Sequence, residues 1–180
     1  MSLESKAPST VALIGYRGTG KTTVAQLLAR SLSYDWVDAD VEVELRAGKS
    51  IAAIFADEGE QAFRDAESLV VAQLCGREHT VLALGGGAVL RGDNRKHIAR
   101  CGAVVWLTAG AETLVSRLEG DPTTRARRPN LTNRGGQQEI RTLLAEREPI
   151  YRACATHTVD TEGKPPAEVA AEVLSLLAAG

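Results

Sequence analysis

The chain has 180 residues, of which 44% are hydrophobic and 24% charged, and its formal net charge is -2. This length fits one domain around a single core, and the charge argues against the broad electrostatic attraction that nucleic-acid binding requires. The three cysteines lie far apart without a C-x-x-C pair, so the sequence indicates neither a disulfide framework nor a zinc site, and we expect a cytoplasmic protein.

Short β-type runs alternate with segments of helical period along the whole chain. The expected strands are 10–14, 36–38, 80–84, 103–107 and 158–160. Apolar residues at helical spacing predict helices over 22–32, over 51–55 after Ser50 as N-cap, over 63–74, and over 169–177. This alternation predicts an α/β fold in which a parallel sheet is covered by helices on both faces.

The first nine residues are polar, and we expect the segment 1–9 to be disordered and residues 10–180 to form a single domain. The longest apolar run near the start, 11–14, is too short for a signal-peptide core or a membrane span. We therefore expect no membrane association.

A phosphate-binding loop follows the first expected strand. Residues 15–22 read G-Y-R-G-T-G-K-T and match G-x-x-x-x-G-K-[ST] between an apolar strand and an amphipathic helix, the context that this motif requires. The glycines let successive N–H groups face phosphate oxygens, and the helix N-terminus adds positive potential. In such loops the lysine reaches the β- and γ-phosphates and the hydroxyl binds Mg²⁺. The expected nucleotide-binding residues here are Gly15, Gly18, Thr19, Gly20, Lys21, Thr22 and Thr23.

Asp38 and Asp40 end the second expected strand, at the edge where open α/β sheets bind their ligands. On an extended chain both side chains point the same way, so one would hold a magnesium-bound water while the other takes a proton from an attacking hydroxyl. The third expected strand has no acid at its end, which makes Asp38 the expected magnesium carboxylate. A solvated turn or a helix N-cap explains the two residues equally well.

Gly85, Gly86 and Gly87 follow the third expected strand and leave its carboxyl end bare, so that a small ligand can lie against the backbone. A flexible loop without a ligand is the alternative. Arg64 lies at an expected helix start, and Arg147 lies in the run E-R-E-P-I-Y. Taken alone, each is typical of a surface or ion-paired arginine, and sequence spacing does not bring the two together.

Residues 119–138 are rich in Gly, Pro, Thr, Asn and Arg and lack a regular period. The stretch is too long for an ordinary connection, and we expect a mobile lid there.

The order of these segments along the chain resembles that of the shikimate kinase family. The matching segments are 15–22, 38–40, Phe63-Arg64, 85–87, and Arg147 with Pro149 and Tyr151, and the similarity runs from residue 11 to about 177. The resemblance implies a P-loop NTPase of the adenylate-kinase-like type, with a five-stranded parallel sheet in the order 2-3-1-4-5. It also implies Mg²⁺ as cofactor and transfer of the γ-phosphoryl group of ATP to shikimate, giving ADP and shikimate 3-phosphate, in chorismate and aromatic amino acid biosynthesis. We expect a monomer.

The resemblance also implies roles for the acceptor-side residues. Asp40 would contact the acceptor hydroxyl as candidate base, and Asp38 would hold the magnesium shell together with Thr22. Arg64 and Arg147 would bind the shikimate carboxylate beside the glycine triplet, because each guanidinium offers parallel donors to a planar carboxylate.

Three further positions are carried over from the family to the nucleotide side. Arg117 is expected to stack on adenine with Pro166 at its other face, although a solvated helix arginine and a helix-starting proline explain both residues as well. The family typically has R-P-L-L in the lid where this chain has R-P-N-L, so Arg128 is the expected arginine that reaches the transferring phosphoryl. Its competitors in the same stretch are Arg125, Arg127 and Arg134.

Two other functions stay open at this point. The first is another small-metabolite kinase of the same fold, acting on gluconate or a nucleoside monophosphate. Arg64, Arg147 and the glycine triplet argue against it, as does the low aromatic content of 4%, because a nucleotide acceptor needs stacking residues. The second is a non-catalytic nucleotide-binding relative, against which the intact Lys21, Thr22 and acidic pair argue.

Overall fold

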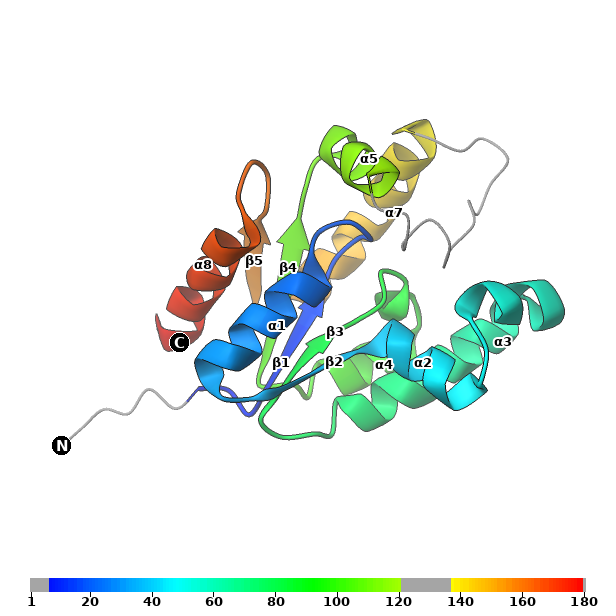
Figure 1. The fold of residues 1–180 in the computed structure, drawn as a ribbon, viewed down its shortest axis with the longest axis horizontal. Coiled ribbons are helices and arrows are strands. Elements are labelled where there is room, and N and C mark those ends of the chain that lie inside the picture. Colours follow the sequence, from blue (N-terminus) through cyan, green and yellow to red (C-terminus); the bar gives the residue numbers. More distant parts are fainter. Residues whose placement is uncertain (1–6, 121–136, 180) are drawn as a thin grey trace.

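The computed structural model describes residues 7–120 and 137–179, and in this part of the chain five parallel strands form one sheet (Figure 1). The strands follow the order β2-β3-β1-β4-β5. The predicted fold class and strand order are therefore confirmed, and each predicted strand agrees with the structure to within one residue at either end. The strands are β1 (Thr10–Ile14), β2 (Asp35–Asp38), β3 (Thr80–Ala83), β4 (Ala103–Thr108) and β5 (His157–Asp160).

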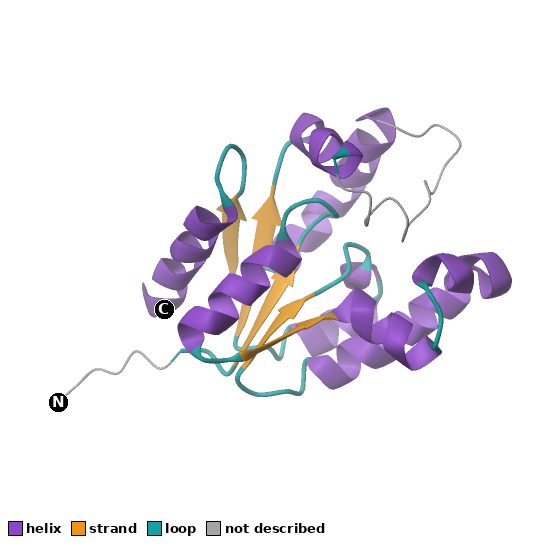
Figure 2. Cartoon of the chain, viewed as in Figure 1, coloured by secondary structure: helices purple, strands orange, loops and turns teal. Residues whose placement is uncertain are grey.

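Helices cover both faces of the sheet (Figure 2) because alternate side chains of each central strand enter two separate cores. Val11 and Leu13 of β1 pack in the core shared with α1 (Lys21–Leu32) and α8 (Pro166–Ala179). Ala12 and Ile14 pack in the core on the other face. Its helices are α2 (Ala39–Ala47), α3 (Ile51–Leu74), α4 (Gly92–Ile98) and the end of α7 (Gln137–Cys154).

Two features of the helices differ from the sequence-based expectation. The two expected segments 51–55 and 63–74 belong to α3, which is interrupted at Gly59, where φ is 84°. Four helices, α2, α4, α5 (Ala111–Glu119) and α7, were not among those predicted from apolar spacing. The last of these contains Pro149, which lacks the N–H that a helix interior normally uses and therefore hides the helical pattern.

The ends of the expected domain fall partly on residues that the structure does not describe. Of the segment 1–9, residues 1–6 lie outside the described part, while the Pro8 carbonyl accepts a hydrogen bond from Tyr34 and the Ser9 carbonyl accepts one from His79. α5 (Ala111–Glu119) precedes residues 121–136, on which most of the expected lid falls. Among the described residues, no helix has the length and apolar character that crossing a bilayer requires.

The topology brings three motifs to one edge of the sheet. β2, β3 and β1 are neighbours and run in parallel, so the residues that follow them leave the sheet at the same edge. Asp38 ends β2, the glycine triplet follows β3, and the phosphate loop follows β1 (Figure 1). Open parallel sheets bind ligands at this edge.

Candidate active site

The phosphate loop curls around the ammonium group of Lys21. Its Nζ donates hydrogen bonds of 2.8 Å to the carbonyls of Gly15 and Tyr16. The buried Thr19 hydroxyl closes the turn by donating to the same Tyr16 carbonyl at 2.9 Å. Gly15 has a φ of 139°, and a Cβ there would lie 2.4 Å from the Leu107 carbonyl oxygen, so no side chain fits at this position.

The loop then opens directly into α1. Gly20 is the N-cap residue of this helix in the left-handed conformation, with a φ of 88°, and Gly18 has a φ of 85°. These are conformations that glycine adopts without strain. The helix begins at Lys21, followed by Thr22 and Thr23, so its free N–H groups and the lysine lie at the same end. This combination favours a bound polyphosphate.

Asp38 links the phosphate loop helix to the end of β2. The Thr22 hydroxyl donates a 2.6 Å hydrogen bond to one oxygen of the Asp38 carboxylate. The other oxygen accepts the backbone N–H of Asp40 at 2.9 Å and of Val41 at 3.4 Å, which makes Asp38 the N-cap of α2. Our prediction that the chain stays extended from Asp38 to Asp40 is therefore wrong, because the helix begins at Ala39.

Asp40 consequently lies in the first turn of α2, where the helix N-terminus favours a negative charge. The two carboxylates are placed by a helix start and not by strand alternation. Asp38 faces Thr22, the hydroxyl that phosphate-loop enzymes use for Mg²⁺. Because Mg²⁺ is usually held by one or two protein groups together with water and substrate phosphates, this pair of residues fits such a site.

Arg64 is buried on α3, with 8% of its surface exposed. Its guanidinium pairs with Glu67 at 2.8 Å, which is itself 1% exposed, and with the more exposed Glu60 at 3.3 Å. Burial alone would lower the pKa of Arg64, but the charges and hydrogen bonds of Glu67 and Glu60 outweigh it and raise that pKa above its ordinary value. The guanidinium fills the space beside Gly87, where a Cβ would lie 2.3 Å from Nη1.

Arg147 reaches the same triplet from α7. It is also 8% exposed, its Nη1 donates to the Gly86 carbonyl at 3.5 Å, and its Cζ lies 5.6 Å from the centre of the Tyr16 ring. Arg64 and Arg147 are therefore brought to adjacent glycines by two different helices. The surface alternative for these arginines is wrong because both are buried, while the ion-paired alternative is confirmed for Arg64, which pairs with Glu67 and Glu60.

The glycine triplet in turn lies against the phosphate loop. A Cβ on Gly86 would be 3.3 Å from the backbone nitrogen of Arg17 and 3.4 Å from the Gly15 carbonyl oxygen. Contacts of this length would be tight for a side chain, so glycine suits this close approach. The guanidiniums of Arg64 and Arg147 and the phosphate loop therefore all lie beside the backbone of Gly86 and Gly87.

A small pocket lies on the other side of the phosphate loop. Its volume is about 190 Å³, and Gly18, Gly20, Arg117 and Pro166 are among its lining residues. The Arg117 guanidinium is fixed there, because it donates to the Gly18 carbonyl at 3.3 Å and to the Thr161 side chain and carbonyl at 3.0 and 2.8 Å. These hydrogen bonds exclude the alternative that Arg117 is only a solvated helix arginine.

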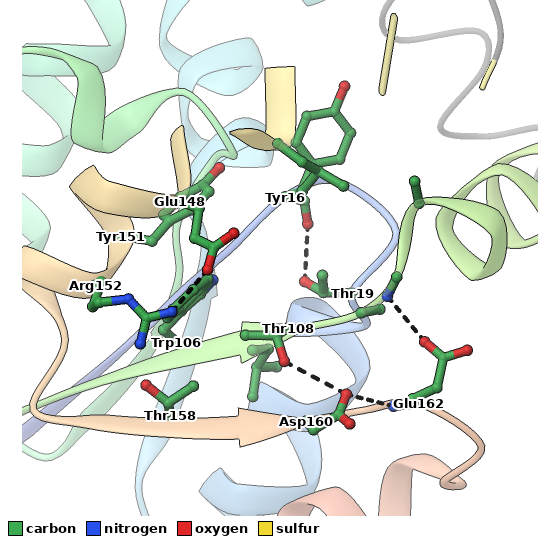
Figure 3. A pocket seen from close by; sticks show the side chains of 15 residues that line it. Tyr16, Thr19, Trp106, Thr108, Glu148, Tyr151, Arg152, Thr158, Asp160 and Glu162 are labelled. Carbon is green, nitrogen blue, oxygen red and sulfur yellow. Dashed lines mark hydrogen bonds and ion pairs between the residues drawn. The ribbon is translucent and has the colours of Figure 1, made fainter. Parts of the chain in front are cut away.

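A second cavity, of about 500 Å³, lies between β4, β5 and α7 (Figure 3). Its polar groups largely satisfy one another: Glu148 pairs with Arg152 at 2.7 Å, and Asp160 accepts the backbone N–H of Glu162 at 3.0 Å. Hydrogen bonds from the Thr113 hydroxyl and the Gly110 N–H lower the pKa of Glu162. This cavity borders the back of the phosphate loop through Tyr16 and Thr19.

Some expected site residues lie outside the described part of the chain, namely Arg128 and its competitors Arg125, Arg127 and Arg134. Sequence reasoning missed two residues that hold the site together. The sequence contains a signal for Glu67, because a glutamate three positions after Arg64 on the same helix can pair with that arginine. Thr161 has no such signal, since its contact with Arg117 depends on the fold.

Comparison with known proteins places these features in one family. The family model described as shikimate kinase matches residues 17–178. A shikimate kinase of Rhodopirellula baltica is 46% identical over 174 residues, covering 97% of this chain and 93% of that protein. Among solved structures, the shikimate kinase of Acinetobacter baumannii in complex with shikimate has a TM-score of 0.89 at 35% identity and covers 97% of this chain and 95% of that one.

A gluconokinase of Sinorhizobium meliloti is a more distant structural relative. Its TM-score is 0.60 at 21% identity, with 96% of this chain and 93% of that one covered. This likeness shows a common fold and nothing more specific.

Proposed function

The chain belongs to the shikimate kinase family, and from this membership we propose that it transfers the γ-phosphoryl group of ATP to the 3-hydroxyl of shikimate, giving ADP and shikimate 3-phosphate. The observation that carries the proposal is the meeting of Arg64 and Arg147 at Gly86 and Gly87, directly against the phosphate loop. Two buried guanidiniums at one place suit a small carboxylated acceptor.

The acceptor is held by its carboxylate and reacts at a hydroxyl. In this proposal Arg64 and Arg147 bind the carboxylate as hydrogen-bond donors, and the bare backbone of Gly86 and Gly87 lets the ring lie close. Glu67 orients the Arg64 guanidinium and balances its charge. Asp40, in the first turn of α2, then accepts the proton of the attacking hydroxyl.

The donor is held by the phosphate loop and the pocket of Arg117 and Pro166. Lys21 leaves the loop carbonyls to contact the β- and γ-phosphates, because phosphate oxygens are stronger acceptors for an ammonium group than backbone carbonyls are. Adenine would occupy the 190 Å³ pocket beside the fixed Arg117 guanidinium. Thr22 and Asp38 would hold Mg²⁺, which when bound neutralises charge on the phosphates.

Direct in-line transfer needs no covalent phosphoenzyme. Lys21 balances the charge that spreads over the γ-phosphoryl oxygens, and Asp40 orients the acceptor. Arg128 is proposed as the further arginine at the transferring group, and closure of the lid around 119–138 would exclude water. These two assignments rest on the family resemblance. We further propose that the protein acts as a cytoplasmic monomer.

ADP release in the presence of ATP and Mg²⁺ tests this function. We expect release that depends on added shikimate and not on gluconate or a nucleoside monophosphate. Release that depends on one of the other acceptors would replace shikimate with that acceptor. Nucleotide binding without any acceptor-dependent release would instead indicate a non-catalytic relative.

A further inference from the structure

Tyr151 has a contact in the acceptor site that the proposed chemistry does not use. It lies on α7 and is 1% exposed, with its ring stacked on Trp106 at a centroid distance of 5.8 Å and an interplanar angle of 23°. Its hydroxyl donates a 2.5 Å hydrogen bond to the carbonyl of Gly86. A stiff aromatic side chain packed in this way holds its hydroxyl in a fixed place.

This hydroxyl is the better placed of two donors to one carbonyl. Arg147, one helical turn earlier on α7, also approaches the Gly86 oxygen, but at 3.5 Å, the outer limit of a hydrogen bond. The Arg147 guanidinium also lies over the Tyr16 ring. Tyr151 therefore does more than Arg147 to fix the Gly86 carbonyl, which leaves the arginine able to turn toward a bound anion.

The geometry of a peptide unit carries this constraint to the next residue. The carbonyl of Gly86 and the N–H of Gly87 belong to one planar unit, and no peptide bond among the described residues is cis. In a trans unit these two groups point in opposite directions. Because Tyr151 holds the oxygen on its own side, the Gly87 N–H faces away from Tyr151, at the residue against which the Arg64 guanidinium lies.

Glycine has no side chain to resist rotation of this peptide unit, so something outside the triplet must orient it. Gly86 lies close to Arg17 and Gly15 of the phosphate loop, and Gly87 lies close to the Arg64 guanidinium. A small rotation would therefore move the donors that face the acceptor, whereas the turn of the phosphate loop is closed by its own Thr19 hydrogen bond. Figure 3 shows Tyr151 on the α7 side of the cavity that backs onto the loop residues Tyr16 and Thr19.

We propose that Tyr151 is a positioning residue for the acceptor: its hydroxyl fixes the Gly86–Gly87 peptide unit so that the Gly87 N–H and the Arg64 guanidinium together face the acceptor carboxylate. The inference rests on the proposed function, because it takes shikimate as the acceptor. It assigns Tyr151 no part in proton or phosphoryl transfer.

The variant Tyr151→Phe removes the hydroxyl and keeps the stacked ring. We expect the KM for shikimate to rise about five- to tenfold, the loss that one buried hydrogen bond represents. We expect the KM for ATP and kcat to stay within about twofold of the wild type, because the phosphate loop is closed by its own Thr19 hydrogen bond and the proposed base Asp40 is placed by the start of α2. Thermal unfolding of the variant shows whether it is folded.

Tyr34→Phe is the matched control. The Tyr34 hydroxyl also donates to a backbone carbonyl, that of Pro8 at 3.2 Å, but next to the start of β1 at the opposite end of the sheet. We expect this control to keep the wild-type KM for shikimate. A Tyr151→Phe enzyme with lower stability but an unchanged KM for shikimate would reduce Tyr151 to a core residue and overturn the inference, as would equal rises in both KM values.

The wild-type enzyme separates failure of the inference from failure of the proposed function. If the wild type shows no shikimate-dependent ADP release, the proposed function fails and the inference fails with it. If the wild type turns over shikimate and Tyr151→Phe behaves identically, only the inference fails.

Discussion

The Thr22 hydroxyl donates a 2.6 Å hydrogen bond to the Asp38 carboxylate, and so joins the first turn of α1 to the end of β2. The same carboxylate caps α2 through its other oxygen. One side chain thus positions the helix that carries Asp40 and faces the hydroxyl that is expected to bind Mg²⁺. The donor and acceptor halves of the site share this residue.

The variant Asp38→Asn separates these two tasks. Asparagine caps helices about as well as aspartate, so the thermal midpoint should change little. The lost charge should weaken the metal site, and we expect activity at limiting Mg²⁺ to fall between about 10- and 100-fold. Turnover measured against Mg²⁺ concentration checks this. Ser50→Ala is the control: it removes the cap of α3, and it should lower the free energy of unfolding by about 1 kcal/mol without changing the Mg²⁺ dependence.

The variant Asp40→Ala should lower kcat by about 10²- to 10⁴-fold, the range over which general bases contribute. ATP affinity should stay near that of the wild type, because the nucleotide is held by the phosphate loop. The matched control is Glu42→Ala, which removes another acid from the first turn of α2, one that pairs with Arg46. If Asp40→Ala retained near-normal turnover, Asp40 would have no part in the mechanism.

The variant Glu67→Gln should destabilise the protein, because it leaves the buried Arg64 guanidinium without its closest charge partner. We expect the free energy of unfolding to fall by on the order of 2 kcal/mol, measured by urea denaturation. The KM for shikimate should rise in parallel. Glu60→Gln removes the more exposed partner of the same arginine and should change stability by less than about 0.5 kcal/mol. Equal effects of both variants would contradict the distinction between the two pairs.

The variant Gly87→Ala tests the packing of Arg64. The backbone of Gly87 has an ordinary φ of -97°, so alanine adds no backbone strain, but its Cβ would lie 2.3 Å from the Arg64 guanidinium. The guanidinium must move, and we expect the catalytic efficiency with shikimate to fall by on the order of 100-fold. Nucleotide affinity, measured by titration calorimetry, should be unchanged. Gly76→Ala is the control. A Cβ on Gly76 would lie 3.5 Å from the Gln73 carbonyl oxygen, which is an ordinary contact, so this variant should have no kinetic effect.

The variant Arg117→Ala should act on the nucleotide alone. Loss of a fixed guanidinium beside the adenine pocket should raise the KM for ATP about tenfold, while the KM for shikimate stays constant. Arg30→Ala, in the exposed last turn of α1, serves as the control for a lost positive charge. A rise in the KM for shikimate would show that Arg117 does not belong to the nucleotide site.

The strands and the phosphate loop were predictable because their signals are local. Each strand is a short apolar run, and the loop has a fixed pattern of glycines that need positive φ. The start of α2 was not predictable from the sequence, because Asp38 and Asp40 are equally consistent with an extended strand end and with a helix cap. Only the structure shows that Asp38 caps the helix while also contacting Thr22.

The acceptor site was predictable from family resemblance but not from spacing. Arg64 and Gly87 are 23 positions apart and Arg147 is 60 positions further on, so their meeting depends on the order of β3 and the packing of α3 and α7. The i,i+3 spacing of Arg64 and Glu67 is a local signal for an ion pair, but the burial of that pair depends on the fold. The hydrogen bond of Tyr151 to Gly86 had no such signal.

In the proposed function, Arg64, Arg147 and Asp40 bind one acceptor beside the phosphate loop. A crystal structure with shikimate and ADP bound together tests it most directly. We predict the shikimate carboxylate within about 3 Å of both guanidiniums and a ring hydroxyl at the same distance from Asp40. Shikimate bound elsewhere, with its carboxylate touching neither arginine, would contradict the account.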